Sequence, residues 1–255
     1  MLPFYRNFVT YKDLYGVHGG FIGWTYEHLG IFSFTNELWN NEQLLGRAAT
    51  TGTTLERAIG DSNQDDQLFA SDRLLFGSNY RPWKPFKHPF YGDIEIGGFV
   101  KETQRVPPMF MLEDLCHRNA AFVMYHADQM PKLVWDDVVV EKVKGDLFTV
   151  TASVKNLRSI PSVAQQAANR RIGLPDTIGL EGTELKVIAG GPLVNRDTGE
   201  IAAAEFEPAK LRLNGGVAGG QTARVRWFVQ GTGEAKLTYA SQKGGTLTKS
   251  VTLKE

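Results

Sequence analysis

The sequence Y-G-V-H-G-G-F-I-G-W-T-Y-E-H-L-G-I-F-S-F-T-N-E-L occupies residues 15–38, and its second half decides the fold that we expect for the first part of the chain. Residues 31–38 are rich in aromatic and β-favouring side chains and follow Gly30. A run of this length and composition predicts a buried strand. Glu37 lies at the end of the predicted strand, where a carboxylate that leaves an apolar wall is well placed to act as a general base. The alternative is a structural surface carboxylate that follows a core strand.

Glycines and aromatic residues recur through this stretch in a particular order: Tyr15, Gly19-Gly20, Trp24, Tyr26, Gly30-Ile31, Phe34-Thr35 and Glu37-Leu38. Together they resemble the closing segment of the catalytic domain in zinc carboxypeptidases of the carboxypeptidase A type. The resemblance implies that Tyr15 binds substrate, that Ile22 lines the side-chain pocket, and that Glu37 is the catalytic glutamate. One position departs from the family pattern, because Gly23 stands where the family usually has Asp before the Trp.

A second segment, H-P-F-Y-G-D-I-E-I-G-G-F at residues 88–99, is similar to one that a large bacterial subset of this family carries before its last catalytic-domain helix. The resemblance implies that residues 1–132 are the C-terminal portion of an α/β, mixed-sheet catalytic domain. It implies a zinc-dependent metallocarboxypeptidase, a hydrolase that releases C-terminal residues from a peptide substrate. It also implies a secreted or periplasmic protein.

The zinc ligands that this resemblance calls for are missing from the sequence. The family holds its zinc with a His-x-x-Glu pair and a further histidine, and no His-x-x-Glu occurs here. The five histidines also lack the close spacing that places imidazoles on one metal. We therefore expect a fragment, inactive alone, whose zinc ligands belong to a missing N-terminal part of the catalytic domain. In the full-length protein, zinc would polarise the scissile carbonyl and Glu37 would take the proton of the attacking water.

The hydrophobic pattern changes after Lys132 from helical to alternating. Apolar and polar residues alternate over residues 148–154 and again over residues 223–229, and glycine turns separate two more such runs at 234–240 and 246–253. Short strands at this spacing predict an all-β sandwich over residues 133–255. Residues 162–183 are expected to form a long connection between strands. This half is similar to the β-domain attached to the bacterial carboxypeptidases.

Three other segments of the first half have a predicted structure. Residues 80–92 hold three prolines and five aromatic residues, which predicts an extended strap over a core, with a substrate rim as the alternative. Pro107-Pro108 introduces a predicted helix that ends before Pro131. Its expected buried face consists of Met109, Leu112, Cys116, Ala120, Val123, Ala127 and Met130. Residues 42–59 are expected to form a polar surface insertion.

Composition excludes several classes of protein. The 255 residues have a formal net charge of zero and 42% hydrophobic content, as in an ordinary globular protein, so nothing suggests a nucleic-acid partner. No apolar run is long enough to span a bilayer. Cys116 is the only cysteine, so an internal disulfide is excluded. Two alternatives to the carboxypeptidase stay open: a non-catalytic protein whose β-sandwich binds peptide or glycan, and an amidase on the same scaffold.

Overall fold

The computed structural model describes residues 7–39 and 64–254, which fall into two compact units. The first unit comprises Met1–Gly19 and Thr35–Met124, and the second comprises Gly20–Phe34 and Tyr125–Glu255. The insertion predicted at residues 42–59 lies outside the described residues. The predicted domain boundary at residue 132 stays a prediction.

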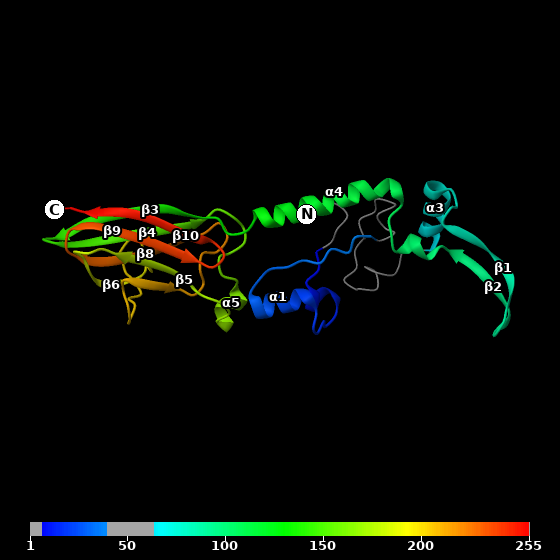
Figure 1. The fold of residues 1–255 in the computed structure, drawn as a ribbon, viewed down its shortest axis with the longest axis horizontal. Coiled ribbons are helices and arrows are strands. Elements are labelled where there is room, and N and C mark those ends of the chain that lie inside the picture. The colour runs from blue at the N-terminus through cyan, green and yellow to red at the C-terminus, as the bar shows by residue number, and fades with distance from the viewer. Residues whose placement is uncertain (1–6, 40–63, 255) are drawn as a thin grey trace. The chain divides into compact units, whose positions relative to one another are not determined.

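The second unit is built from two four-stranded sheets in which every neighbouring pair of strands is antiparallel (Figure 1). One sheet has the order β3 (Leu133–Lys144), β4 (Leu147–Asn156), β8 (Thr222–Gln230) and β6 (Lys186–Pro192). The other has the order β10 (Gly245–Leu253), β9 (Gly233–Ser241), β5 (Asp176–Glu181) and β7 (Lys210–Leu213).

A single hydrophobic core joins these two sheets. Alternate residues of β4, among them Phe148 and Val150, share the core with Ile178 of β5 and Leu237 of β9. Trp227 of β8 is completely buried, and its indole Nε1 donates a hydrogen bond to the Pro208 carbonyl at 2.9 Å. Side chains that alternate between a shared core and the outside are the arrangement of a β-sandwich. The prediction of a β-rich second half is therefore confirmed.

Helices α1 (Phe21–Leu29) and α5 (Gln165–Arg170) contact each other in the second unit (Figure 1). Gly30 ends α1 in the left-handed region at φ +61°, and a Cβ added there would lie 2.6 Å from the Ala167 Cβ. Glycine is needed at this position both for the backbone conformation and for the close approach. The Lys243 ammonium donates a hydrogen bond to the Gly30 carbonyl, which ties the end of α1 to the β9–β10 turn.

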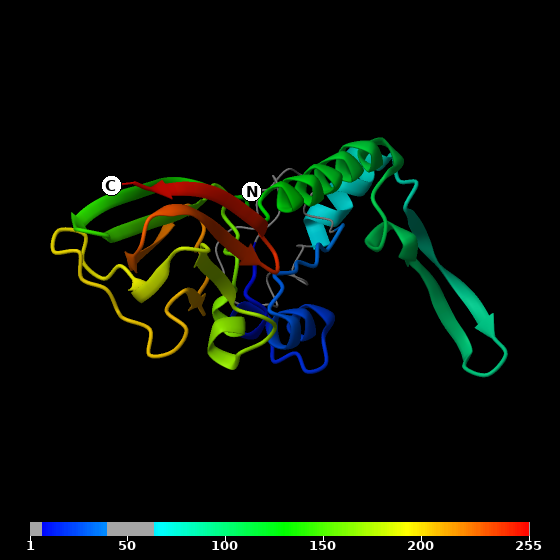
Figure 2. The ribbon, with the colours of Figure 1, turned by 60° about the vertical axis from the view of Figure 1, so that its left-hand side comes forward.

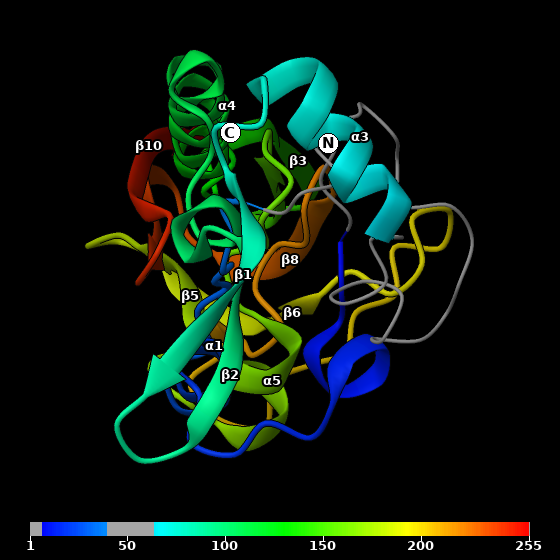
Figure 3. The ribbon, with the colours of Figure 1, turned by 90° about the vertical axis from the view of Figure 1, so that its right-hand side faces the viewer.

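The first unit contains α3 (Gln64–Leu75), the hairpin of β1 (Tyr80–His88) and β2 (Gly92–Phe99), and most of α4 (Met109–Asp128). Two short helical turns, Thr10–Leu14 and Lys101–Gln104, complete its described elements. The hairpin extends away from α3 and from the start of α4 (Figure 2), and its strands run side by side (Figure 3). None of the described helices is both long and apolar enough to cross a membrane.

The α/β catalytic sheet predicted for residues 1–132 is not found among the described residues of the first unit. Their only sheet is the two-stranded hairpin, and residues 31–38 form no strand. Strand formation needs a neighbouring strand, and residues 31–38 belong to none of the sheets among the described residues. Ile31, Phe34 and Leu38 are exposed instead of buried. Residues 21–29, which precede this stretch, form the helix α1.

Two packing predictions in the first half are also wrong. The strap predicted at residues 80–92 is a hairpin strand whose Trp83 is 59% exposed, so it does not cover a core. The predicted helix after Pro108 is confirmed as α4, but its expected apolar face is not buried. Met109 is 81% exposed, whereas Leu115, which the periodicity left out, is buried.

Candidate functional site

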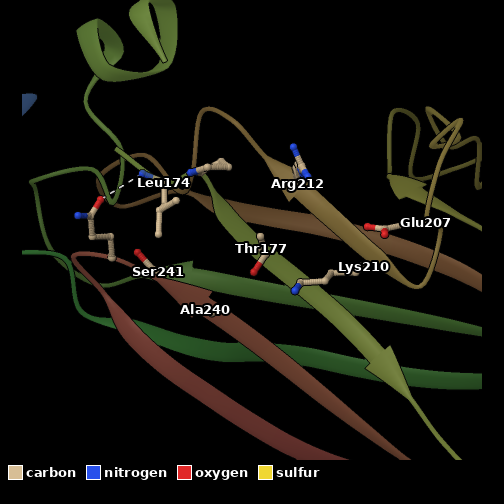
Figure 4. A pocket seen from close by; sticks show the side chains of 9 residues that line it. Leu174, Thr177, Glu207, Lys210, Arg212, Ala240 and Ser241 are labelled. Atoms are coloured by element: carbon tan, nitrogen blue, oxygen red, sulfur yellow. Dashed lines mark hydrogen bonds between the residues drawn. The ribbon is translucent and has the colours of Figure 1, made fainter. Parts of the chain in front are cut away.

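A groove of about 550 Å³ lies on the outer face of the sheet that contains β5, β7 and β9 (Figure 4). Ile178, Leu211 and Tyr239 of these strands point into the core, so the residues next to them in sequence point outward. The groove is lined by Leu174, Pro175, Thr177, Glu207, Lys210, Arg212, Ala240, Ser241 and Gln242. These come from three segments that are distant in sequence, and the sheet brings them together.

Lys210 and Arg212 supply the positive charge of the groove. They are separated by one residue of β7, so both side chains lie on the outer face (Figure 4). In the register of the sheet, Arg212 lies opposite Thr177, and Lys210 lies opposite Gly179, which has no side chain. Neither cation forms an ion pair with any residue that the structure describes. Both are therefore exposed cations available to an anionic ligand.

Glu207 lies at the N-terminal approach to β7. Its backbone has φ +47°, a left-handed conformation that costs a non-glycine residue about 1 kcal/mol. The turn is fixed by two hydrogen bonds: the Lys210 N–H donates to the Glu207 carbonyl at 2.9 Å, and the Pro208 carbonyl accepts from Trp227. Such strained residues persist where the surrounding structure holds them, and they cluster at binding sites.

A second fixed loop forms the other end of the groove. The Leu174 N–H donates a hydrogen bond to Gln242 Oε1 at 3.3 Å, which holds the loop before β5 against the end of β9 (Figure 4). Gly173 has φ +73°, and a Cβ there would come within 2.7 Å of the same Gln242 oxygen. Leu174 itself is 72% exposed. The groove therefore combines charge on β7 with an apolar side chain at this end.

The floor of the groove rests on a buried polar cluster inside the core. Asp176 is completely buried, and its Oδ2 accepts hydrogen bonds from Ser162 Oγ at 2.5 Å and from the Tyr239 hydroxyl at 2.8 Å. The Val217 N–H donates to Ser162 Oγ at 2.7 Å. Burial, together with the neighbouring Asp176 carboxylate, raises the pKa of Tyr239 well above its ordinary value. The tyrosine therefore stays protonated as a donor, and the cluster anchors β5 to β9.

The titratable side chains of this region lie in two places, the groove and the buried cluster. The described part of the chain contains no group of three or more His, Cys, Asp or Glu side chains that could hold a metal. The buried Asp176 cluster contains a carboxylate and two hydroxyls, but these groups are inside the core. The charged residues that line the groove are Glu207, Lys210 and Arg212.

The residues that the sequence predicted as a site are divided between the two units. Tyr15 and Glu37 are exposed residues of the first unit outside any regular element, whereas Ile22 lies half-buried on α1 of the second unit. The catalytic role of Glu37 and the substrate-binding roles of the other two stay predictions. The groove residues were missed because they are scattered along the chain. The alternating Lys-Leu-Arg-Leu of β7 was a local signal for one charged and one apolar face.

Comparison with family models finds a match in the second half of the chain. A family model described as a domain of unknown function (DUF8731) matches residues 132–252, just under half of the chain. No curated protein matches the chain. The predicted membership of the zinc carboxypeptidases is therefore wrong: no carboxypeptidase family was matched, and the stretch at residues 31–38 that suggested it does not form the expected strand.

Solved structures show only distant likeness. A conjugative transposon lipoprotein from Bacteroides eggerthii is 11% identical, with a TM-score of 0.28 over 49% of this chain and 97% of that one. A GH3 β-glucosidase from Bifidobacterium adolescentis is 16% identical, with a TM-score of 0.22 over 48% of this chain and 17% of that one. The β-glucosidase DesR from Streptomyces venezuelae is 14% identical, with a TM-score of 0.21 over 49% of this chain and 15% of that one. Scores this low do not establish a shared fold.

Proposed function

We propose that this chain is a non-catalytic binding protein and that the groove on its β-sandwich binds an extended peptide. The observation that carries the proposal is the pair of cations on β7, Lys210 and Arg212, which form no ion pair with a described residue and face outward at the edge of a sheet. Peptides are often recognised at exposed sheet edges, because the free backbone groups of the edge strand pair with those of an extended peptide.

A peptide fits the groove better than a glycan, the other ligand that the sequence left open. None of the nine described residues that line the groove is aromatic, whereas most small-ligand sites are lined by apolar and aromatic side chains. A sugar also has no backbone to match the repeat of a strand edge. Zinc-dependent peptide hydrolysis by a longer protein, and amidase activity, stay predictions; both were suggested by the resemblance that the comparisons overturn.

Blocking the groove tests this proposal. The full chain is applied to one array of capped extended peptides and to another of oligosaccharides, beside a Thr177→Trp variant that fills the centre of the floor. We expect peptide binding that Thr177→Trp abolishes. Thr248→Trp, an exposed substitution on β10 of the same sheet and outside the groove, is the matched control and should bind as the wild type does. Binding to oligosaccharides alone, or equal peptide binding by both variants, would refute the proposed function.

A further inference from the structure

We infer that the ligand is an acidic peptide that adds to β7 as a fifth strand of the sheet, with carboxylates at alternate positions beside Lys210 and Arg212. This inference rests on the proposed function and names the class of peptide. It follows from three features of β7: its free backbone groups, the spacing of its cations, and the charge at its N-terminal approach.

The backbone of β7 is available on the side away from β5. The strand is last in the order β10-β9-β5-β7, and on its inner side the Leu180 N–H donates to the Ala209 carbonyl at 2.9 Å. The backbone N–H and carbonyl groups of successive residues in an antiparallel strand point to opposite sides within the sheet. The backbone groups of Leu211 therefore also point toward β5, while those of Lys210 and Arg212 point toward the open edge. The Lys210 N–H is used by the Glu207 carbonyl. The Lys210 carbonyl and both backbone groups of Arg212 are left for a ligand strand.

The spacing of the two cations selects the side-chain pattern of the ligand. Residues two apart in a strand are separated by about 6.6 to 6.8 Å and lie on the same face. In an added strand, the side chains beside Lys210 and Arg212 would therefore belong to residues two apart in the peptide. Carboxylates at those two positions would each meet a cation, and the guanidinium of Arg212 can bind a carboxylate through two parallel hydrogen bonds.

Glu207 limits the acidic pattern to those two positions. It lines the same groove at the approach to β7, and like charges placed opposite each other are unfavourable. A peptide residue beside Glu207 is therefore expected to be neutral or basic. The three charges together fix the direction of the peptide along β7.

The same cations have a purely structural explanation. Lysine and arginine on a short edge strand discourage pairing with other chains, and β7 has only four residues. That explanation predicts that removing the charges causes self-association and leaves peptide binding unchanged. It therefore differs from the acidic-peptide inference in a measurable way.

The test uses the full chain and three fluorescent, capped hexapeptides, with binding followed by anisotropy. The first has glutamate at two alternate positions, the second has glutamine there, and the third has the two glutamates adjacent. We expect the first to bind about tenfold more tightly than the second, because each of two exposed charge pairs contributes a few-fold. It should bind a few-fold more tightly than the third, in which only one glutamate lies on the face of the cations. The advantage should shrink at about 0.5 M salt, where screening is stronger. Arg212→Gln should reduce the preference to a few-fold, because one charge pair remains, whereas Lys249→Gln, on the opposite edge strand β10, should leave it unchanged.

Two results would overturn the inference, and they differ from failure of the proposed function. One is equal binding of the glutamate and glutamine peptides. The other is an Arg212→Gln variant that self-associates but still prefers the glutamate peptide as strongly as the wild type does. Either would show that the cations only discourage pairing of β7 with other chains. In that case peptide binding in the groove would stand. If none of the three peptides binds, both the inference and the proposed peptide-binding function are wrong.

Discussion

Replacing Tyr239 by phenylalanine removes one hydroxyl from the buried cluster under the groove and nothing else from the core. The Tyr239 hydroxyl donates to Asp176 Oδ2 at 2.8 Å, and both residues are completely buried. A buried acceptor that loses a partner cannot turn to water, so the substitution should cost about 1 to 3 kcal/mol of unfolding free energy. Ser162 remains as the second donor to the same oxygen, so the sandwich should still fold.

The cost of this substitution should depend on pH in a defined way. Burial first, and then the Asp176 carboxylate, raise the pKa of Tyr239 in the folded protein, while an unfolded tyrosine titrates near 10. Stability from this group is fully present below pH 10 and is lost progressively as the pH rises from the unfolded pKa toward the folded one. The wild type should lose about 1.4 kcal/mol per pH unit from this one residue, and Tyr239→Phe should not.

Urea unfolding followed by far-ultraviolet circular dichroism, from pH 8 to pH 11.5, measures both effects. We expect Tyr239→Phe to be less stable than the wild type by a constant amount up to about pH 10, and the gap to narrow above it. Tyr125→Phe is the control, because Tyr125 is 62% exposed. A gap that stays constant to pH 11.5 would refute the reasoning, since it would mean that the Tyr239 hydroxyl ionises in the folded protein as easily as in the unfolded one.

Two further predictions concern stability and use the same unfolding assay. Burial lowers the pKa of Lys243, with Asp176 acting in the opposite direction, so the unfolded state binds more protons than the folded state between the lowered pKa and 10.5. The free energy of unfolding should therefore rise with pH across that window. A Lys243→Met variant that lacks this rise would confirm the prediction, whereas a variant with the same pH dependence as the wild type would contradict it. Gly231 has φ +113°, and a Cβ there would lie 2.1 Å from a backbone oxygen, so Gly231→Ala should cost about 2 kcal/mol or more. Gly215→Ala, where a Cβ meets nothing within 4 Å, should be close to neutral, and equal costs at the two glycines would count against the described turn.

Four strands of the sandwich, β4, β8, β9 and β10, could be predicted because apolar and polar residues alternate along them. Phe148, Val150, Ala152 and Val154 all lie in the core, as their period of two indicated. β5 was missed and assigned to a connection, because it has only six residues and Gly179 interrupts its apolar pattern. Short strands are defined mainly by their neighbours in the sheet, which a local reading of the sequence does not include.

The errors in the first half have a different physical origin. The aromatic run at residues 31–38 matches a strand in composition, but composition does not supply the neighbouring strand that its backbone groups need. In α4, the periodicity correctly predicted the helix and misjudged which side is buried. Periodicity identifies an apolar face and does not show what packs against it. The groove could not be predicted for a similar reason, since Leu174, Arg212 and Gln242 meet only through the sheet order.

The central claim is that an extended peptide pairs with the open edge of β7, and amide hydrogen exchange of the full chain tests it most directly. With saturating glutamate peptide, we predict slower exchange at the Arg212 N–H, which faces the open edge, and no change along β10 at the opposite edge of the sheet. Peptide binding that leaves exchange at Arg212 unchanged, with protection elsewhere, would contradict the account.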